Sequence, residues 1–539
     1  MEDIYQGQEI YEDEDRDVIQ QAIKAKKEKF RIQIRQSKNK QLIQQKRMKL
    51  LNGQQHQPKN DFEVDQNDKQ GFKSNNKEYE IQQSQLKNNI SILLSLNQHS
   101  KQQVQVAVDS LIAYLLDGSY NEDIEQLTQI SGTIQYLIVL GQQPNSDFND
   151  QELAKSALAL LLNITYYCDQ QQMKYFSNQD IMNSLLQLLY SENMQIREYC
   201  LTTINNIIQE DVDNIKFLIE RFFAQEIISL VTTFALSNEI ILDLSSIIKQ
   251  IVVQSNIPYS EATEFLIPID ELIEINLSQK LSEDQDNTAL NNLLESVIAI
   301  LNKEDSEDIY ENFVLEYQRL ITNMIEIIKQ IEYNQKFNSV AINISQIFGL
   351  LLSGNIKTTQ ILVQNDIFDS LKILIKHPKK EVRSESMWAV SNLFVFSNVQ
   401  GLKEYLRDLV FWENILDAAF QDHKSVRKWA YVSILNALII NDIEFIEIIL
   451  ERFPESDLIK FIFEKLEDKD YQNVLVSLLE AVKSLISYGE YCQNQNNYEE
   501  NHILSQMQSI NSKQIIQQIQ DSPDNDLYSV SSFLLDKIQ

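Results

Sequence analysis

Apolar residues gather in runs of helical length from about Asn88 onward, and polar clusters separate these runs. Each run reads as a helix with one apolar face. Only 10 Gly and 7 Pro occur in 539 residues, too few for the many turns that a sheet protein of this size requires. The pattern predicts an all-α protein whose long helices are joined by short polar connections.

One pattern, an apolar helix that ends near an Asn, returns along the chain. It occurs in SALALLLNIT, REYCLTTINNII, LLESVIAILN, SESMWAVSNLF and WAYVSILNALI, with the weaker segments DLSSIIKQIVV and SQIFGLLLSG between them. Aligning these segments places equivalent positions at intervals of 43, 44, 52, 48, 42 and 44 residues, at Asn163, Asn206, Gln250, Asn302, Leu350, Asn392 and Asn436.

A step of this size is typical of armadillo and HEAT repeats, whose units of two or three helices stack on their neighbours. The alternative is a non-repetitive helical bundle with chance similarities, and the regular step favours the repeats. We interpret the two longer intervals as polar insertion loops around residues 278–288 and 301–313.

Charge divides the chain into segments. Residues 1–17 are acidic, residues 18–50 hold eleven Lys or Arg against the single acid Glu28, and residues 51–539 carry a net charge of −34. Such a body repels nucleic-acid phosphates and attracts basic polypeptide, including its own basic arm. Residues 52–80 are polar and contain Gly53, Pro58 and Gly71, as expected of a linker. We predict an acidic N-terminus at 1–17, a basic arm at 18–51, a flexible linker at 52–86 and a repeat domain at 87–539.

The sequence lacks the signals that mark several other classes of protein. Cys168, Cys200 and Cys492 are widely spaced, which predicts no disulfide framework or zinc site and favours a reducing compartment. The N-terminus lacks the apolar core of a secretory signal, and no charge-free apolar run reaches 18 residues, so we expect a soluble intracellular protein. The motifs GxxxxGK[ST], GxGxxG, GxSxG and HExxH do not occur. We therefore expect neither enzymatic activity nor a cofactor.

One segment, SESMWAVSNLF, carries recognisable binding chemistry. Trp388 and Asn392 lie four residues apart, on one face of the expected helix. In stacked repeats, a row of Trp side chains can hold the stems and charged heads of Lys or Arg. A row of Asn side chains can pair with the main chain of an extended peptide. Together they predict a surface that binds an extended basic segment.

With this motif the chain resembles the importin-α family of nuclear import adaptors, whose repeats carry W-x-x-x-N on the third helix. The resemblance implies a right-handed superhelical armadillo solenoid of about ten repeats. It also implies a concave groove that binds basic nuclear localisation signals of cargo proteins. The residues expected in this groove are Asn163, Asn206, Glu210, Trp388, Asn392 and Asn436.

The basic arm supports the same resemblance, because its run from Phe30 to Leu51 is similar to the family's importin-β-binding segment. The arm residues implied are Lys24, Lys26, Lys27, Lys29, Arg31, Arg35, Lys38, Lys46 and Arg47. Lys46 and Arg47 stand where the family has a cluster that mimics cargo, which implies autoinhibition. The C-terminal repeats resemble those that bind the family's export receptor. The resemblance thus implies a protein that shuttles between cytoplasm and nucleus.

The groove departs from the family at six of its seven aligned Trp positions. These hold Ala159, Thr202, Ser246, Ile298, Gln346 and Val432. Losing a cation–π wall costs about 0.5–2 kcal/mol per slot. We therefore expect classical signals to bind weakly at the first three repeats, where the family has its larger cargo site. Trp388 belongs to the smaller site.

Several alternatives stay open. Trp388 alone suits helix packing, the Asn positions suit helix-end capping, and we interpret Trp412 and Trp429 as packing residues. The arm alone resembles a membrane-surface helix, a calmodulin target or an RNA-binding tail, and we expect it to be disordered or helical. At the level of function, the alternatives are an armadillo scaffold for one specialised partner and a nucleic-acid binder that uses the arm.

Overall fold

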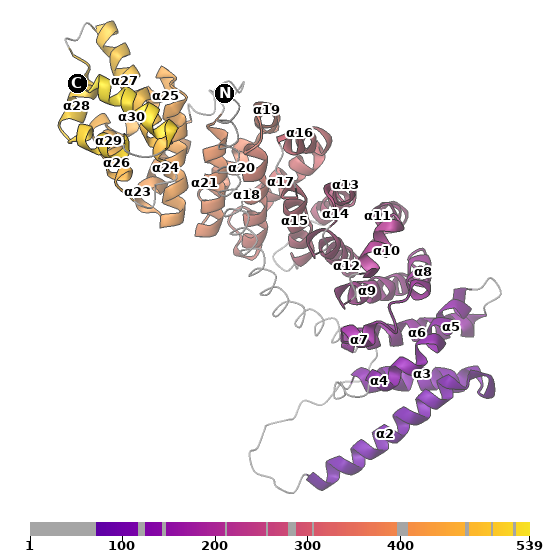
Figure 1. Ribbon diagram of the computed structural model, residues 1–539. Coiled ribbons are helices and arrows are strands. Elements are labelled where there is room, and N and C mark those ends of the chain that lie inside the picture. Colours follow the sequence, from indigo (N-terminus) through magenta and orange to yellow (C-terminus); the bar gives the residue numbers. More distant parts are fainter. Residues whose placement is uncertain are drawn as a thin grey trace, which may run out of the picture. The chain divides into compact units, whose positions relative to one another are not determined.

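The structure is a computed structural model in which every regular element of the described ranges is a helix, as the sequence predicts (Figure 1). The ranges described are 72–116, 124–142, 147–210, 213–254, 257–278, 287–303, 307–395, 408–468, 474–496, 500–520 and 524–538. The acidic N-terminus and the basic arm lie outside these ranges, so predictions about them stay predictions. None of the helices described is long and apolar enough to cross a membrane.

The chain divides into two compact units, residues 1–123 and 124–539. In the first unit α2 (Phe72–Leu94), η1 (Leu96–Gln98) and α3 (Lys101–Leu116) follow one another, and α2 packs on α3. Helix α2 begins inside the predicted linker, which corrects the boundary at residue 86. A helix forms here because residues 72–94 contain no Gly or Pro and because their Lys, Gln and Glu residues favour a helix.

The second unit repeats a group of three helices. The first helices are α7 (Gln170–Met173), α10 (Asp213–Glu220), α13 (Tyr259–Thr263), α16 (Glu307–Glu316), α19 (Ile356–Gln364), α25 (Ile443–Arg452) and α28 (His502–Gln508). The second helices are α5 (Ser131–Gln142), α8 (Gln179–Leu188), α11 (Phe223–Thr233), α14 (Leu266–Ser278), α17 (Gln318–Ile331), α20 (Ile367–Leu374), α23 (Leu409–Gln421), α26 (Glu455–Leu466) and α29 (Ser512–Gln520).

The third helices carry the Asn pattern found in the sequence. They are α6 (Phe148–Tyr167), α9 (Met194–Glu210), α12 (Asn238–Lys249), α15 (Thr288–Leu301), α18 (Asn338–Leu352), α21 (Lys380–Leu393), α24 (Lys424–Ile439), α27 (Leu475–Asn496) and α30 (Asn525–Lys537). Short elements complete the unit: α4 (Ile124–Leu127), η3 (Thr128–Ile130), η4 (Gln250–Gln254) and η5 (Gln335–Phe337).

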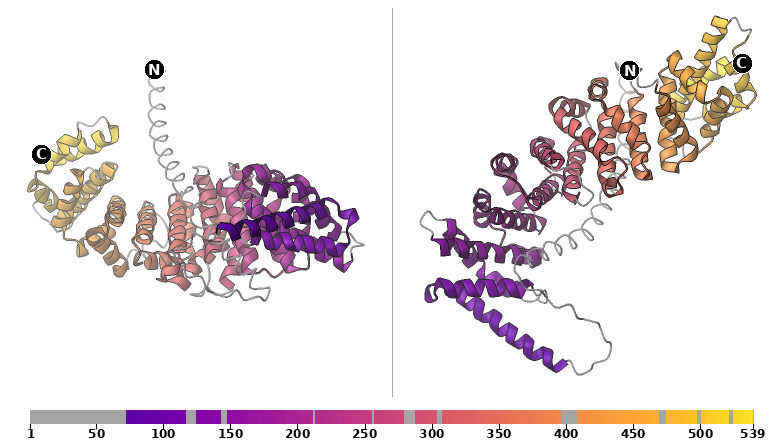
Figure 2. Two further views of the ribbon diagram at one scale, coloured as in Figure 1. Left: turned by 90° about the horizontal axis from the view of Figure 1, so that it is seen from below. Right: turned by 180° about the vertical axis from the view of Figure 1, so that it is seen from behind.

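Each third helix packs against the third helix of the next group, from α6 and α9 through to α27 and α30. In the right-hand view of Figure 2 the colours of the second unit follow one another in chain order along the stack. The interior between groups is mostly apolar, as at α18, where Val340, Ile344, Ile347, Phe348 and Leu351 are fully buried. Because each group covers the apolar face of its neighbour, the stack buries one continuous core. The second unit is therefore an all-α solenoid of three-helix, armadillo-type repeats, which confirms the predicted fold class.

Sharp bends between first and second helices are made without glycine. Phe222 precedes α11 with φ 56°, and Asp366 precedes α20 with φ 60°. Both residues lie sixteen positions after an aligned position, Asn206 and Leu350 respectively. The left-handed conformation is unusual for residues with a side chain, and it occurs at the same register position in these two repeats.

One predicted insertion loop is wrong in part. The segment 301–313 contains the start of α16, which buries Ile309 and Phe313. Asp308, in the first turn of this helix, is exposed and faces solvent. Most of the other predicted loop, residues 279–286, lies outside the described residues.

Candidate functional site

The predicted groove residues all lie on third helices. Asn163 is on α6, Asn206 and Glu210 on α9, Trp388 and Asn392 on α21, and Asn436 on α24. We call the row formed by the aligned Asn and Trp positions of α6 to α24 the third-helix face. Its residues range from buried, at Asn206, through half-buried, at Asn392 and Asn436, to exposed, at Asn302.

Three of the Asn side chains join consecutive repeats. Asn392 Nδ2 donates to the carbonyl oxygen of Gly349 at 2.9 Å, and Asn436 Nδ2 donates to that of Ser391 at 2.8 Å. Asn206 Nδ2 lies 3.5 Å from the carbonyl oxygen of Leu162. Each acceptor immediately precedes the aligned position of the preceding repeat. The bonds are therefore one interaction repeated in register, and they hold neighbouring third helices together.

The remaining two Asn side chains bond within their own helices. Asn163 Nδ2 donates to the carbonyl oxygen of Ala159 at 2.7 Å. Asn302 is the C-cap of α15 and donates to the carbonyl oxygen of Ile298 at 2.8 Å. Asn302 thus caps the end of its helix, which is the alternative that the sequence left open. Asn206, Asn392 and Asn436 instead bond to the preceding repeat.

The indole of Trp388 lies directly on the backbone of the preceding repeat. A Cβ atom built at Gly349 would stand 2.3 Å from Trp388 Cε3 and 2.4 Å from Cζ3. Only glycine leaves room for the ring in this position. Gly349 therefore fixes the Trp388 indole through its missing side chain and positions Asn392 through its carbonyl oxygen.

A second indole, that of Trp429 on α24, faces Trp388. The ring centroids are 6.4 Å apart and the planes are inclined at 50°, and Lys428 Nζ lies 5.8 Å from the Trp429 ring centroid. Trp429 lies one helical turn before the aligned position Val432, so the alignment gave it no role. By contrast Trp412 is a core residue, 1% exposed, with its ring 5.3 Å from that of Phe394 and nearly parallel to it.

Polar side chains replace indoles where α9 meets α12, and they bond to one another. Thr202 Oγ1 donates to Asp243 Oδ2 at 2.6 Å, and Ser246 Oγ donates to Asn205 Oδ1 at 3.1 Å. Gln250 Nε2 also donates to Asn205 Oδ1, and Asn205 Nδ2 donates to Asp243 Oδ1 at 3.3 Å. We call these five residues the polar seam. Most of their donors and acceptors already serve the contact between repeats, whereas Gln250 Oε1 is buried with no hydrogen-bond partner among the described residues.

Glu210 is exposed at the C-terminal end of α9. Its carboxylate acts on the thiol of Cys168, the buried C-cap of α6. Burial raises the pKa of Cys168 to about 12, and the carboxylates of Asp169 and Glu210 act in the same direction. Cys168 therefore stays a neutral thiol at neutral pH.

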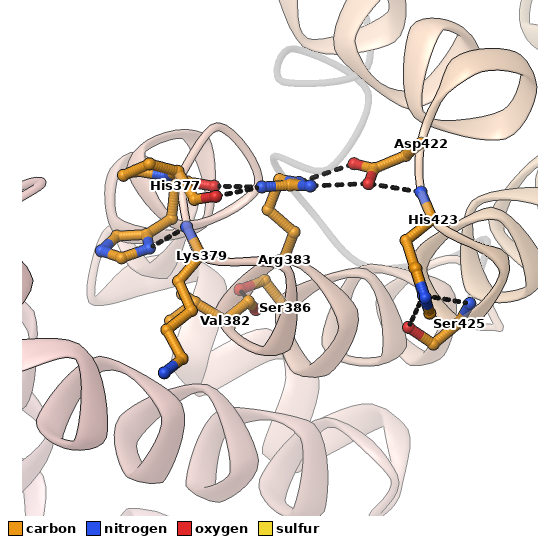
Figure 3. Close-up of polar contacts among 9 residues, drawn as sticks. His377, Lys379, Val382, Arg383, Ser386, Asp422, His423 and Ser425 are labelled. Carbon is orange, nitrogen blue, oxygen red and sulfur yellow. Dashed lines mark hydrogen bonds and ion pairs between the residues drawn. The ribbon is translucent and has the colours of Figure 1, made fainter.

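An arginine at the start of α21 supports this face (Figure 3). Arg383 donates from Nε and Nη2 to the two carboxylate oxygens of Asp422, each at 2.6 Å. Its Nη1 donates to the carbonyl oxygens of His377 and Pro378 at 2.7 and 2.8 Å. Because Asp422 immediately precedes the N-cap of α24, His423, Arg383 fixes the spacing between the helices that carry Trp388 and Trp429.

Sequence reasoning missed this residue type, although a signal was present. Arg197, Arg383 and Arg427 each stand nine residues before an aligned Asn. Arg197 Nη1 donates to the carbonyl oxygen of Ser191 at 2.6 Å, which repeats the contact of Arg383 with His377.

Burial acts to raise the pKa of Asp422, but the hydrogen bonds from Arg383 and from the His423 backbone outweigh it and leave that pKa below its usual value.

Comparison with known proteins gives a likeness in fold. No family model matches the chain, and no curated protein matches it. It is similar to the crystal structure of an engineered protein from the Northeast Structural Genomics Consortium at 14% identity and a TM-score of 0.56, over 84% of this chain and 98% of that one. At this identity the likeness shows the fold alone.

Two designed armadillo repeat proteins are similar at lower TM-scores. One shares 15% identity over 50% of this chain and all of its own, with a TM-score of 0.38. The other, in complex with the peptide (KR)4, shares 16% identity over 49% of this chain and 98% of its own, with a TM-score of 0.36.

Proposed function

We propose that this armadillo-type solenoid is a protein-binding adaptor that takes an extended basic segment where α21 meets α24, as a nuclear import adaptor resembling importin-α. The observation that carries the proposal is the pairing of Trp388 with Trp429, at 6.4 Å between ring centroids, beside two half-buried Asn side chains. The proposed activity is binding, with no catalytic step, cofactor or direct contact with nucleic acid.

The chemistry of these side chains matches a basic peptide in extended form. The indole faces attract Lys or Arg through cation–π interactions, worth about 0.5–2 kcal/mol each. A side-chain amide has two N–H groups and one oxygen. Among the described residues, Asn392 and Asn436 each donate once to the preceding repeat, and their second N–H and the oxygen Oδ1 have no partner there. These two groups complement the carbonyl and N–H of a peptide backbone.

The polar seam makes α9–α12 a weaker surface for the same ligand. Thr202 and Ser246 stand at Trp positions, and their hydroxyls already donate to Asp243 and Asn205. A peptide bound there would compete with bonds inside the protein, and it would find no indole to pack on. We therefore place the main binding surface at α21–α24.

The basic arm adds the carrier half of the proposal. With eleven Lys or Arg in residues 18–50, it would bind importin-β, and its Lys46 and Arg47 would compete with cargo for the acidic body. Importin-β would then favour cargo loading by removing the competitor, an effect of mass action. The export receptor would bind the C-terminal repeats, and the protein would shuttle between cytoplasm and nucleus.

Titrating the full chain with a labelled peptide of alternating Lys and Arg tests the binding half. We expect salt-sensitive binding that disappears when Gln replaces every Lys and Arg of the peptide. A second titration, with importin-β, compares the full chain with a variant in which Lys24, Lys26, Lys27 and Lys29 are changed to Ala. Equal affinity of the two chains for importin-β would contradict the carrier role.

A second candidate is an armadillo scaffold with one specialised partner and no general signal binding. The polar seam favours it, because the seam occupies the part of the third-helix face where a general adaptor would offer indoles. Folded protein that binds none of a panel of basic peptides would support the scaffold and exclude the adaptor.

A further inference from the structure

A lysine of the chain itself binds acidic and amide groups where α12 meets α15, beside the third-helix face: Lys249 immediately precedes the aligned Gln250, and Glu295 stands three residues before the aligned Ile298. Lys249 on α12 forms an ion pair with Glu295 on α15. Its Nζ lies 3.2 Å from Asn292 Oδ1. The side chains of Lys249 and Glu295 are only 15% and 19% exposed, so this is a largely desolvated pair and not a surface contact.

The two groups that hold Lys249 form a small cation site. Asn292 and Glu295 lie three residues apart, on one side of α15. Asn292 Nδ2 lies 3.4 Å from Ser245 Oγ, which turns the amide oxygen toward Lys249. A carboxylate and an amide oxygen at this spacing offer an ammonium group one charged and one neutral hydrogen bond. The same set would hold a lysine of a bound peptide.

We infer that Lys249 is a built-in ligand that fills this site and so excludes the lysine side chains of a partner from the middle of the third-helix face. The inference rests on the proposed function, in that the face binds basic segments. Lys249 thereby determines specificity: it confines a basic partner to the surface around Trp388 and Trp429. Removal of its charge opens a second lysine site at α12–α15.

Removing Lys249 alone leaves the Glu295 carboxylate with no cation, and an unpaired, largely buried carboxylate gains from any cation that reaches it. The variant Lys249→Met keeps a long apolar side chain and removes the ammonium. We expect it to bind a Lys-rich peptide about tenfold more tightly than the unaltered chain, as one charge-assisted hydrogen bond would give. The double variant Lys249→Met, Glu295→Gln should lose this gain.

A matched control lies off the third-helix face. Lys357 of α19 pairs with Glu311 of α16 at 3.1 Å, also between repeats, with a lysine side chain that is 72% exposed. Lys357→Met should leave peptide affinity unchanged. Circular dichroism and thermal unfolding establish that each variant is folded. If Lys249→Met unfolds, Lys249→Gln, which keeps a donor toward Asn292, replaces it with the same expected gain.

Repeating the titrations in a Trp388→Ala background separates this inference from the proposed function. A gain from Lys249→Met that persists there and is lost with Glu295→Gln supports the lysine site, whatever the unaltered chain binds. A folded Lys249→Met or Lys249→Gln variant that binds the peptide no better than its parent overturns it. Loss of all binding by Trp388→Ala, without any gain from the Lys249 variants, would leave the proposed function standing and reject only the inference.

Discussion

Asn436 donates a hydrogen bond from Nδ2 to the carbonyl oxygen of Ser391 at 2.8 Å, and so joins α24 to α21. Asn392 makes the same bond to Gly349 one repeat earlier, at 2.9 Å. An Asn that the sequence suggested as a peptide ligand therefore has a second task, the attachment of one repeat to the next. Any substitution there must be tested for stability as well as for binding.

Replacing Asn436 by Ala should lower the free energy of unfolding by about 1 kcal/mol, because the bond to Ser391 is lost. Asn302→Ala is the control, because that exposed side chain bonds within its own helix. Urea unfolding of both variants measures the difference. If Asn302→Ala lowers the free energy of unfolding as much as Asn436→Ala does, the hydrogen bond between repeats does not stabilise the chain more than a bond within one helix.

Gly349→Ala should destabilise the chain by about 1–3 kcal/mol, because the added methyl displaces the Trp388 indole from a tightly packed position. Gly132 of α5 is the matched control. A Cβ there meets no atom within 4 Å, so Gly132→Ala should be neutral or stabilise by up to about 1 kcal/mol. Tryptophan fluorescence and urea unfolding report both effects. A Gly349→Ala variant as stable as the parent, with unchanged emission, would contradict the packing described.

Asp422→Asn should lower the free energy of unfolding by about 1–3 kcal/mol, because the Arg383 guanidinium then meets one neutral amide oxygen in place of two carboxylate oxygens. The pair Lys216–Glu220 is the comparison, with side chains 81% and 61% exposed. Glu220→Gln should cost less than about 0.5 kcal/mol. Because the pKa of Asp422 is lowered in the folded chain, its contribution is present at neutral pH and is lost only in acid, as the pH falls through that lowered value.

The stability of the folded chain should depend on pH through His377 as well. Its side chain is 1% exposed, and burial, together with the charges of Arg383 and Lys379, lowers its pKa in the folded chain. The unfolded chain, with a histidine pKa of about 6.5, therefore takes up a proton that the folded chain does not. Stability should fall as the pH drops below about 6.5.

The variant His377→Asn tests this dependence, because its side-chain oxygen can still accept a hydrogen bond from the Lys379 backbone. Between about pH 7.5 and 5.5, on either side of the histidine pKa, its unfolding free energy should change less than that of the parent. Equal changes in the two proteins would show that His377 has no part in the pH dependence.

The fold could be predicted because stacking imposes the same demands on every repeat. Apolar helices that end near Asn163, Asn206, Asn392 and Asn436 return at nearly constant intervals, and the structure places all of them on third helices. The scarcity of glycine likewise predicted long helices. The left-handed bend at Phe222 could not be predicted, since a bulky aromatic residue rarely adopts that conformation; Asp366 adopts it too, but Asp is too common in other conformations to mark the bend.

For the candidate site, the sequence predicted which residues share a helix face but not the contacts that their side chains make. The alignment placed Trp388 and Asn392 on one helix face, but the direction of an amide bond and the contact with Trp429 depend on the neighbouring repeat, forty residues away in sequence. The ion pair between Arg383 and Asp422 likewise depends on the neighbouring repeat. Arg383 was visible as an arginine nine residues before an aligned Asn, yet its partner is defined only once α21 and α24 stack.

Affinity for a basic peptide, measured by fluorescence anisotropy with the full chain and with Trp388→Ala, tests the central claim most directly. Trp388→Ala should raise the Kd about 2- to 30-fold, the loss of one cation–π wall. Tyr175→Ala is the control, because it removes an aromatic side chain that is 56% exposed and lies on no third helix; its Kd should equal that of the parent. A folded Trp388→Ala variant that also binds with the parent's Kd would contradict a binding surface at α21–α24.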